Sequence, residues 1–166
     1  RSQTQLRKLE IHAKSEDWDD GITGNLSELG QGLGSCAQLQ TLDLNFYRNK
    51  ITGDLSSLGQ GLGSCAQLQT LVELNFNDNN ISGDLSSLGQ GLGSCAQLQT
   101  LDLNFENNSI TGDLSALGQG LGSCAQLQTL DLNFYRTKLQ TLNLDFWRNE
   151  ITGDLSELGQ GLGDRK

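Results

Sequence analysis

Cysteine is the residue type in this chain with the widest chemical repertoire, and the spacing of its four copies limits which chemistry they can perform. Each stands in the same Gly-Ser-Cys-Ala-Gln context, 29 or 30 residues from the next. Zinc sites and disulfide frameworks use closer pairs such as C-x-x-C, and the sequence contains none. We therefore expect a ladder of small buried thiols, which favours an intracellular, reducing compartment. The positions are Cys36, Cys65, Cys95 and Cys124.

The other candidates for chemistry match no catalytic or ligand-binding motif. The G-x-G-x-G runs, as at 30–34, are not the G-x-G-x-x-G of a dinucleotide loop, and no G-K-S or G-K-T follows them. The acidic run at 16–20 puts Trp18 where a calcium loop needs a ligand. The only histidine, His12, has no G-x-S-x-G nucleophile elbow to serve. We predict that the protein is not an enzyme and takes no cofactor or metal.

The elements that position these residues are copies of one repeat. A period of about 20–50 residues indicates a solenoid, in which each repeat is buried by its neighbours. Within residues 39–67, Leu42, Leu44 and Phe46 alternate with polar residues, which predicts a half-buried strand with Asp43 and Asn45 facing solvent. The segment LGSCAQLQTL recurs at 33–42, 62–71, 92–101 and 121–130.

A short helix is predicted after each strand. Its apolar face in the second repeat consists of Leu55, Leu58, Leu62 and Cys65, and Asp54 can cap its start. Gly59, Gly61 and Gly63 oppose a regular helix, each by about 0.5–1 kcal/mol relative to alanine. We expect the helix to stop or loosen near these glycines, and we expect neighbouring segments to pack closely in compensation.

The spacing L-x-x-L-x-L-x-F-x-x-N-x-I resembles the leucine-rich repeat, with Leu44, Phe46, Asn49 and Ile51 at the family's positions. The 29-residue length and the cysteine are similar to the ribonuclease-inhibitor-like, cysteine-containing type, and I-T-G-D-L is similar to plant-type repeats. The resemblance implies a right-handed α/β solenoid with parallel strands on its concave face and short helices on its convex face. It also implies that an asparagine ladder pairs the turn backbone. The matching residues are Asn49, Asn79, Asn108 and Asn149, with Asp20 and Thr137 as departures.

We expect residues 1–166 to form a single array of about five coils, and we take the chain to be a fragment of a longer protein. The pattern is irregular at 71–73 and at 135–141. The extra residue in the first irregularity predicts a bulge at Leu71–Glu73. At 135–141 two strand patterns follow each other directly, which leaves a local hairpin, a long strand, or an omission between Lys138 and Leu139. The intact patterning on both sides favours the omission.

The charge and the outward sheet residues suggest the partner. A net charge of −9 disfavours nucleic acid and anionic membranes, and no apolar run is long enough for membrane insertion. Rows of Thr, acidic and Asn residues bordered by aromatics suit a basic protein or peptide. We predict a non-enzymatic protein-interaction or scaffolding module, a subunit of a larger assembly. The predicted contact residues are Asp43, Asp102, Asp131, Tyr135, Asp145 and Trp147.

Three alternatives stay open for this face. It could be merely solvated, with its acidic residues preventing aggregation. The Thr and Asn rows could bind ice or a polysaccharide, although the intervening acidic row does not suit such a ligand. The chain could also be a purely structural subunit of a large assembly.

Overall fold

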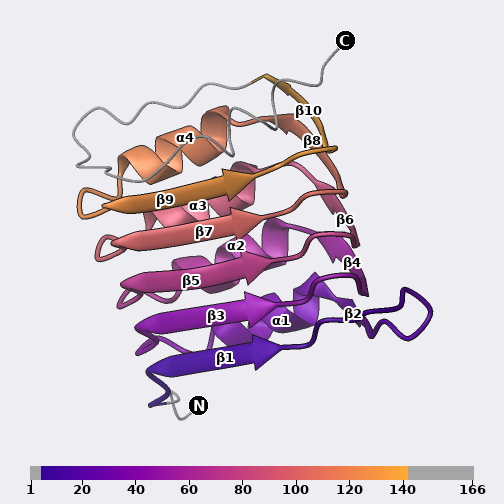
Figure 1. Ribbon diagram of the computed structural model, residues 1–166. Helices are drawn as coiled ribbons and strands as arrows, with labels where there is room; N and C mark the ends of the chain where they lie inside the picture. The colour runs from indigo at the N-terminus through magenta and orange to yellow at the C-terminus, as the bar shows by residue number, and fades with distance from the viewer. Residues whose placement is uncertain (1–4, 142–166) are drawn as a thin grey trace.

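Each repeat forms one coil of the chain, and each coil contributes one strand to a first sheet and one to a second (Figure 1). The computed structural model describes residues 5–141, except for the side chains of 112, 113 and 138–141. The first sheet has the order β1-β3-β5-β7-β9 and the second the order β10-β8-β6-β4-β2. All described strand pairs are parallel. The α/β class with parallel strands and short helices is therefore confirmed.

The helices stack behind the first sheet, and the second sheet flanks both layers (Figure 1). The first sheet consists of β1 (Lys8–His12), β3 (Thr41–Asn45), β5 (Thr70–Asn75), β7 (Thr100–Asn104) and β9 (Thr129–Asn133). The second consists of β2 (Thr23–Asn25), β4 (Lys50–Asp54), β6 (Asn80–Gly83), β8 (Ser109–Asp113) and β10 (Lys138–Thr141). The helices are α1 (Leu26–Leu33), α2 (Ser56–Gly63), α3 (Ser86–Gly93) and α4 (Ser115–Gly122).

The apolar residues of the first sheet form the core because they alternate with polar residues along each strand. Leu42 and Leu44 of β3 are fully buried, as the sequence pattern predicts. The next inward position is phenylalanine in four coils, and successive rings stack with centroids 5.4, 5.6 and 5.8 Å apart. Such aromatic pairs contribute about 0.5–1.5 kcal/mol each beyond the area they bury. The stack comprises Phe46, Phe76, Phe105 and Phe134.

The helices bury the face that the sequence predicts. In the second coil the Asp54 carboxylate accepts a hydrogen bond from the Ser56 backbone N–H at 2.8 Å, which confirms the predicted cap. Asp84 caps α3 in the same way at 2.7 Å. The fully buried residues of this face are Leu55, Leu58, Leu62 and Cys65.

The glycines of the helices allow neighbouring helices to touch through their backbones. A Cβ on Gly59 would lie 2.2 Å from the Ser87 carbonyl oxygen, and a Cβ on Gly61 would lie 2.2 Å from that of Gly30. No larger residue fits at either position without a backbone shift. The helix continues through these two glycines and ends at Gly63. The predicted close packing is confirmed, and the helix stops only at the last glycine.

The predicted asparagine ladder is present in the turns after the first-sheet strands. The side-chain oxygen of Asn79 accepts a hydrogen bond from the Ile51 N–H at 2.9 Å, and its amide donates to the Phe46 carbonyl at 2.8 Å. Both groups belong to the preceding coil, so the ladder ties successive turns together. Asn49 and Asn108 bond in the same pattern.

Two positions of the ladder carry a residue other than asparagine, and neither ties two turns together in this way. The Thr137 hydroxyl donates to the Phe134 carbonyl within its own turn at 2.7 Å. Asp20 is exposed. Asn149 lies outside the described residues.

The second sheet is a correction to the sequence-based expectation, which has no strand between the asparagine and the helix. Three of these strands, β4, β6 and β8, carry a single buried apolar residue, such as Ile51 in β4, so no alternation marks them in the sequence. A glycine at or near the end of two of these strands has positive φ, +106° at Gly53 in β4 and +94° at Gly83 in β6. A left-handed backbone of this kind favours glycine.

The predicted bulge at Leu71–Glu73 is present. Leu42 pairs with Leu71 and Asp43 pairs with Glu73, so Val72 is the extra residue and its side chain is exposed. Leu74 stays fully buried after the bulge. The insertion therefore leaves the inward and outward faces of β5 unchanged.

The second irregularity forms neither a hairpin nor a long strand, so both of these expectations are wrong. β9 ends at Asn133, and the chain turns into β10, which pairs with β8 in the second sheet. Lys138 pairs with Thr111 and Leu139 with Gly112, so both residues belong to one strand. The segment KLQT occupies the place that I-T-G-D holds in the inner coils. The omission of residues between Lys138 and Leu139 stays a prediction.

Candidate functional site: the polar face of the first sheet

The outward side chains of the first sheet, which we call the polar sheet face, are aligned in rows by the parallel register. Adjacent strands lie about 4.8 Å apart, so residues in one row are close neighbours. In the acidic row, Glu10 pairs with Asp43, Asp43 with Glu73, and Asp102 with Asp131. A row of threonines precedes it and a row of asparagines follows it. The asparagines are Asn45, Asn75, Asn104 and Asn133.

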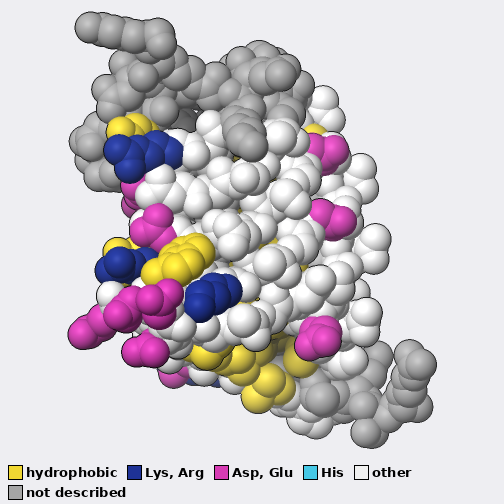
Figure 2. All heavy atoms as spheres, turned by 90° about the vertical axis from the view of Figure 1, so that its right-hand side faces the viewer, with side chains coloured by type: hydrophobic (Ala, Val, Ile, Leu, Met, Phe, Trp, Pro, Cys, Tyr) yellow, Lys and Arg dark blue, Asp and Glu magenta, His cyan; other side chains and the backbone are white. Residues whose placement is uncertain are grey.

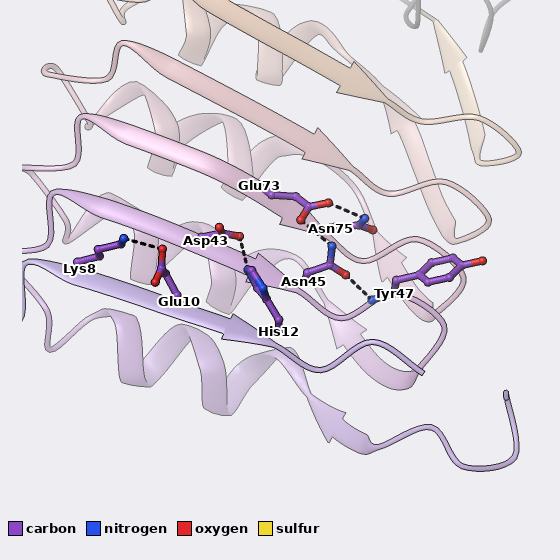
Figure 3. A network of polar contacts seen from close by, with 8 residues as sticks. All are labelled: Lys8, Glu10, His12, Asp43, Asn45, Tyr47, Glu73 and Asn75. Carbon is purple, nitrogen blue, oxygen red and sulfur yellow. Dashed lines mark hydrogen bonds and ion pairs between the residues drawn. The ribbon is translucent and has the colours of Figure 1, made fainter. Parts of the chain in front are cut away.

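Basic side chains of β1 balance the amino-terminal part of the acidic row. Lys8 Nζ lies 2.6 Å from Glu10 Oε1, and His12 Nε2 lies 2.9 Å from Asp43 Oδ1 (Figure 3). The second contact is an ion pair when the imidazole is protonated. Asp43 is only 9% exposed. The expectation that it faces solvent is wrong, because His12 from one neighbouring strand and Glu73 from the other lie beside it.

Glu73 is held by two asparagines. Asn45 Nδ2 donates to one carboxylate oxygen at 2.6 Å, and Asn75 Nδ2 donates to the other at 2.9 Å (Figure 3). Asn45 also accepts a hydrogen bond from the Tyr47 backbone N–H at 3.2 Å, and it is 1% exposed. Asn45, expected to face solvent, is thus a buried bridge between β3 and β5. The bulge at Val72 is what brings Glu73 into this row.

The carboxyl-terminal part of the acidic row has no such balance. Asp102 and Asp131 are register neighbours, both half-buried, and neither forms a salt bridge within residues 5–141. Burial, and then the carboxylates of Asp131, Glu73 and Asp43, raise the pKa of Asp102 to about 6. A cation placed between Asp102 and Asp131 would favour the charged form of both carboxylates and offset their mutual repulsion.

Aromatic and acidic side chains border the asparagine row. Tyr135 is half-buried, and Arg136 lies over its ring with the guanidinium carbon 5.2 Å from the centroid. Glu106 occupies the equivalent position one coil earlier, where it accepts hydrogen bonds from Asn77 at 3.3 Å and Asn133 at 3.2 Å. Sequence reasoning missed Glu106, because this residue breaks the aromatic pattern set by Tyr47 and Tyr135.

The structure thus places four predicted contact residues on or beside one face. Asp102 and Asp131 lie together, Asp43 is buried on β3, two strands from β7, and Tyr135 borders the same face. Asp145 and Trp147 lie outside the described residues. The assignment of these six residues to a partner stays a prediction.

The chemistry of the thiols matches the expected ladder of buried cysteines. All four are buried and free. Burial raises the pKa of Cys65 to about 11, that of Cys95 to about 12 and that of Cys124 to about 11. The thiolate is the nucleophile and metal ligand, so these protonated thiols are inert at neutral pH.

Two kinds of site are absent from the described part of the chain. Residues 5–141 contain no group of three or more His, Cys, Asp or Glu side chains that could hold a metal ion. Over the same residues, every helix is too short and too polar to cross a membrane.

Comparison with known proteins adds only weak likeness to solved structures. No protein-family model matches the chain, and no curated protein matches it. A solved structure of a plant peptide hormone receptor, RGFR1 in complex with RGF2, is 19% identical, with a TM-score of 0.26. The match covers 81% of this chain and 36% of the receptor chain, so the chain spans about a third of that protein's length. This TM-score is too low to establish a shared fold, and the architecture above rests on the strands and helices themselves.

Proposed function

We propose that this protein is a non-enzymatic interaction module that binds a basic protein or peptide on the polar sheet face. The observation that carries the proposal is the pair Asp102 and Asp131, two neighbouring carboxylates without a cation of their own in the described residues. Side chains on paired strands need little reorganisation when a ligand arrives, which reduces the entropic penalty of binding. A lysine or arginine of the partner would bridge these two carboxylates.

The finer features of the fold belong to the same proposal. We take the array to be a right-handed leucine-rich-repeat solenoid of the ribonuclease-inhibitor-like type, with the first sheet on its concave side. Solenoids use such surfaces for extended binding. The asparagine ladder, the inward leucines and the stacked parallel strands support this assignment. Membership of a larger assembly is part of the proposal as well.

The protonation of Asp102 gives the proposed site a testable pH dependence. Its pKa of about 6 means that the side chain is largely neutral at pH 5 and largely charged at pH 7. A cationic peptide binds the charged form better, so its affinity should rise across this interval. Added salt should weaken the binding, because the contact is electrostatic and partly exposed.

The experiment is calorimetric titration of the protein with a short oligo-lysine peptide at pH 5 and pH 7. We expect binding at pH 7, weaker binding at pH 5, and a loss of about tenfold, or 1.4 kcal/mol, in the double variant Asp102→Asn, Asp131→Asn. The matched control is Glu28→Gln, which removes an exposed acid from α1, away from the polar sheet face. Equal affinity in the double variant and the control would refute the proposed site.

Tyr135 tests whether the border of the face takes part. Aromatic side chains dominate binding when they become buried, whereas exposed acids mainly steer the approach. We therefore expect Tyr135→Ala to leave the association rate of a basic peptide with apolar residues almost unchanged. Its dissociation rate should increase. Surface plasmon resonance separates the two rates. An unchanged dissociation rate would exclude Tyr135 from the site.

A further inference from the structure

The bulge in β5 leaves an apolar side chain exposed in the middle of the array. Val72 is 42% exposed, whereas Leu71 and Leu74, which flank Val72 and Glu73, are fully buried. Four large apolar side chains are exposed within residues 5–141, and Val72 is the only one of them that belongs to an inner coil. Bulges re-aim side chains and are common beside binding and active sites. Val72 therefore gives the polar sheet face an apolar contact point that the regular repeat lacks.

Val72 lies beside the two carboxylates that form no salt bridge in the described residues. On β7, Asp102 is the only residue between the two leucines that pair with the buried leucines of β5. Asp102 thus lies opposite Val72 and Glu73, and its neighbour on the other side is Asp131. An apolar side chain and a pair of carboxylates therefore share one part of the polar sheet face.

The nearest other acids of the row already have partners. Glu73 accepts hydrogen bonds from two asparagines, and Asp43 Oδ1 lies 2.9 Å from His12 Nε2. The place for a cation of the ligand is therefore between β7 and β9. The order across the sheet follows from this, with the apolar contact on β5 and the cation on its carboxyl-terminal side.

A second acidic part of the surface has basic side chains beside it. The segment 16–20 contains four acids and Trp18, which is 37% exposed. Arg48 and Lys50 donate hydrogen bonds to backbone carbonyls of this segment at 2.8 and 3.0 Å. Figure 2 shows acidic and basic side chains next to each other at its lower left. Repulsion from these two cations disfavours a cationic ligand at this segment.

The spacing of the groups on the polar sheet face fits an extended peptide. Adjacent strands are about 4.8 Å apart, so the midpoint between Asp102 and Asp131 lies about 1.5 strand spacings, roughly 7 Å, from β5. Side chains two residues apart in an extended chain point to the same side and are separated by about 6.8 Å. An apolar residue and a cation with one residue between them can therefore reach Val72 and both carboxylates together. Adjacent residues point to opposite sides and cannot.

We propose that the polar sheet face selects an extended peptide in which one residue separates an apolar side chain from a lysine or arginine. This selectivity rests on the proposed function and adds Val72 as a residue that determines specificity. The ligand crosses β5, β7 and β9, with its apolar side chain against Val72 and its cation between Asp102 and Asp131. The apolar contact also excludes water from the neighbouring carboxylates, which strengthens their attraction for the cation.

Three blocked heptapeptides of equal charge test the spacing. The spaced peptide is Ser-Leu-Ser-Lys-Ser-Leu-Ser, its isomer is Ser-Ser-Leu-Lys-Leu-Ser-Ser, and the plain peptide is Ser-Ser-Ser-Lys-Ser-Ser-Ser. Each is symmetric about its lysine, so the result does not depend on the direction in which the peptide lies. NMR titration of the full chain at pH 7 measures even weak dissociation constants. We expect the spaced peptide to bind about fivefold more tightly than the other two.

Val72→Ser tests whether the preference comes from the bulge. Because Val72 is exposed, the variant should fold, lose the preference for the spaced peptide and bind the plain peptide as the wild type does. Val72→Thr keeps the β-branched shape of the side chain, and it should lose part of the preference. The matched control is Trp18→Ser, which removes the exposed apolar side chain of the other acidic segment and should keep the preference in full.

The outcomes separate this selectivity from the proposed function. Equal affinity of the wild type for the spaced peptide and its isomer would overturn the selectivity, as would a preference that survives in Val72→Ser. The plain peptide tests the cation site alone, and its affinity should fall in the double variant Asp102→Asn, Asp131→Asn. If it falls while the preference is missing, only the selectivity is wrong. An unchanged affinity of the double variant for the plain peptide would refute the proposed function, and the selectivity with it.

Discussion

The first coil and the inner coils carry almost the same helix sequence, yet their equivalent residues have different surroundings. Gly61 touches the backbone of the preceding helix, whereas Gly32 touches nothing on that side. Ile81 is fully buried, whereas Ile22 is 46% exposed. The difference shows that burial on this side of a coil is supplied by the preceding coil and not by the residue's own segment. A substitution should therefore have opposite or unequal effects in the two places.

The largest expected effect is the loss of an inner core leucine. Leu103→Ala removes a fully buried side chain and should lower the free energy of unfolding by about 2–5 kcal/mol. Ile11, its counterpart in β1, is only partly buried, so Ile11→Ala should lower it by roughly half as much. Urea unfolding of both variants measures the two values. Equal losses would show that the first coil is covered as completely as the inner ones.

Gly61→Ala should have the next largest effect. Its Cβ would lie 2.2 Å from the Gly30 oxygen, so the helices must separate. Forced overpacking of this kind typically lowers the free energy of unfolding by about 1–3 kcal/mol. Thermal unfolding followed by circular dichroism tests it. A variant as stable as the wild type would mean that the helix layer is more yielding than its backbone contacts suggest.

Removing one asparagine of the ladder should lower the free energy of unfolding by as much as Gly61→Ala does, or by less. Asn79→Ala leaves the Ile51 N–H and the Phe46 carbonyl without their partner in the buried turn. An unsatisfied buried group lowers the free energy of unfolding by about 1–3 kcal/mol. Asp20→Ala, at the ladder's exposed departure in the first coil, is the control and should change it little. Urea unfolding distinguishes the two, and a similar loss in both variants would contradict the comparison.

Asp102 should produce a smaller effect that depends on pH. Because its pKa is raised to about 6, the folded state retains a proton that the unfolded chain has released between about pH 4 and pH 6. The free energy of unfolding should therefore fall as pH rises through this window. Asp102→Asn removes the penalty and should be more stable than the wild type at pH 7, by about 1 kcal/mol after allowance for solvent screening.

Urea unfolding of Asp102→Asn and the wild type at pH 4, 5, 6 and 7 measures that dependence. The advantage of Asp102→Asn should be smallest at pH 4, which lies close to the unfolded-state pKa of about 3.9, because the carboxyl is protonated in both states only below that pH. Glu28→Gln is again the matched control and should lack this trend. A larger advantage for Asp102→Asn at pH 4 than at pH 7 would contradict the stated sign.

Gly32→Ala should give the smallest effect, and it should have the opposite sign to Gly61→Ala. The new methyl group meets open space, and alanine is the better helix former. The free energy of unfolding should rise by about 0.5–1 kcal/mol. Urea unfolding of both variants measures the change. A destabilised Gly32→Ala would remove the sharpest contrast between the first coil and the inner coils.

Sequence reasoning was most successful where one position repeats in every coil. The inward leucines, the buried cysteines, the asparagine ladder and the close contact of the helix glycines all follow from residues that recur in phase. The bulge at Val72 was predictable for the same reason, because an added residue stands out against a regular period. Sequence reasoning failed for the second sheet, because β4, β6 and β8 contribute only one buried apolar residue each and so show no alternation.

The sequence by itself determined the coil, its inward residues and the pairing of its turns, because these depend on a local pattern that every repeat restates. Only the tertiary structure decided the burial of Asp43, the raised pKa of Asp102 and the open space next to Gly32. Each of these depends on what lies in the adjacent coil, about one repeat away along the chain. The physical reason is that exposure and electrostatic environment are properties of neighbouring groups in space, and the residue type alone does not specify them.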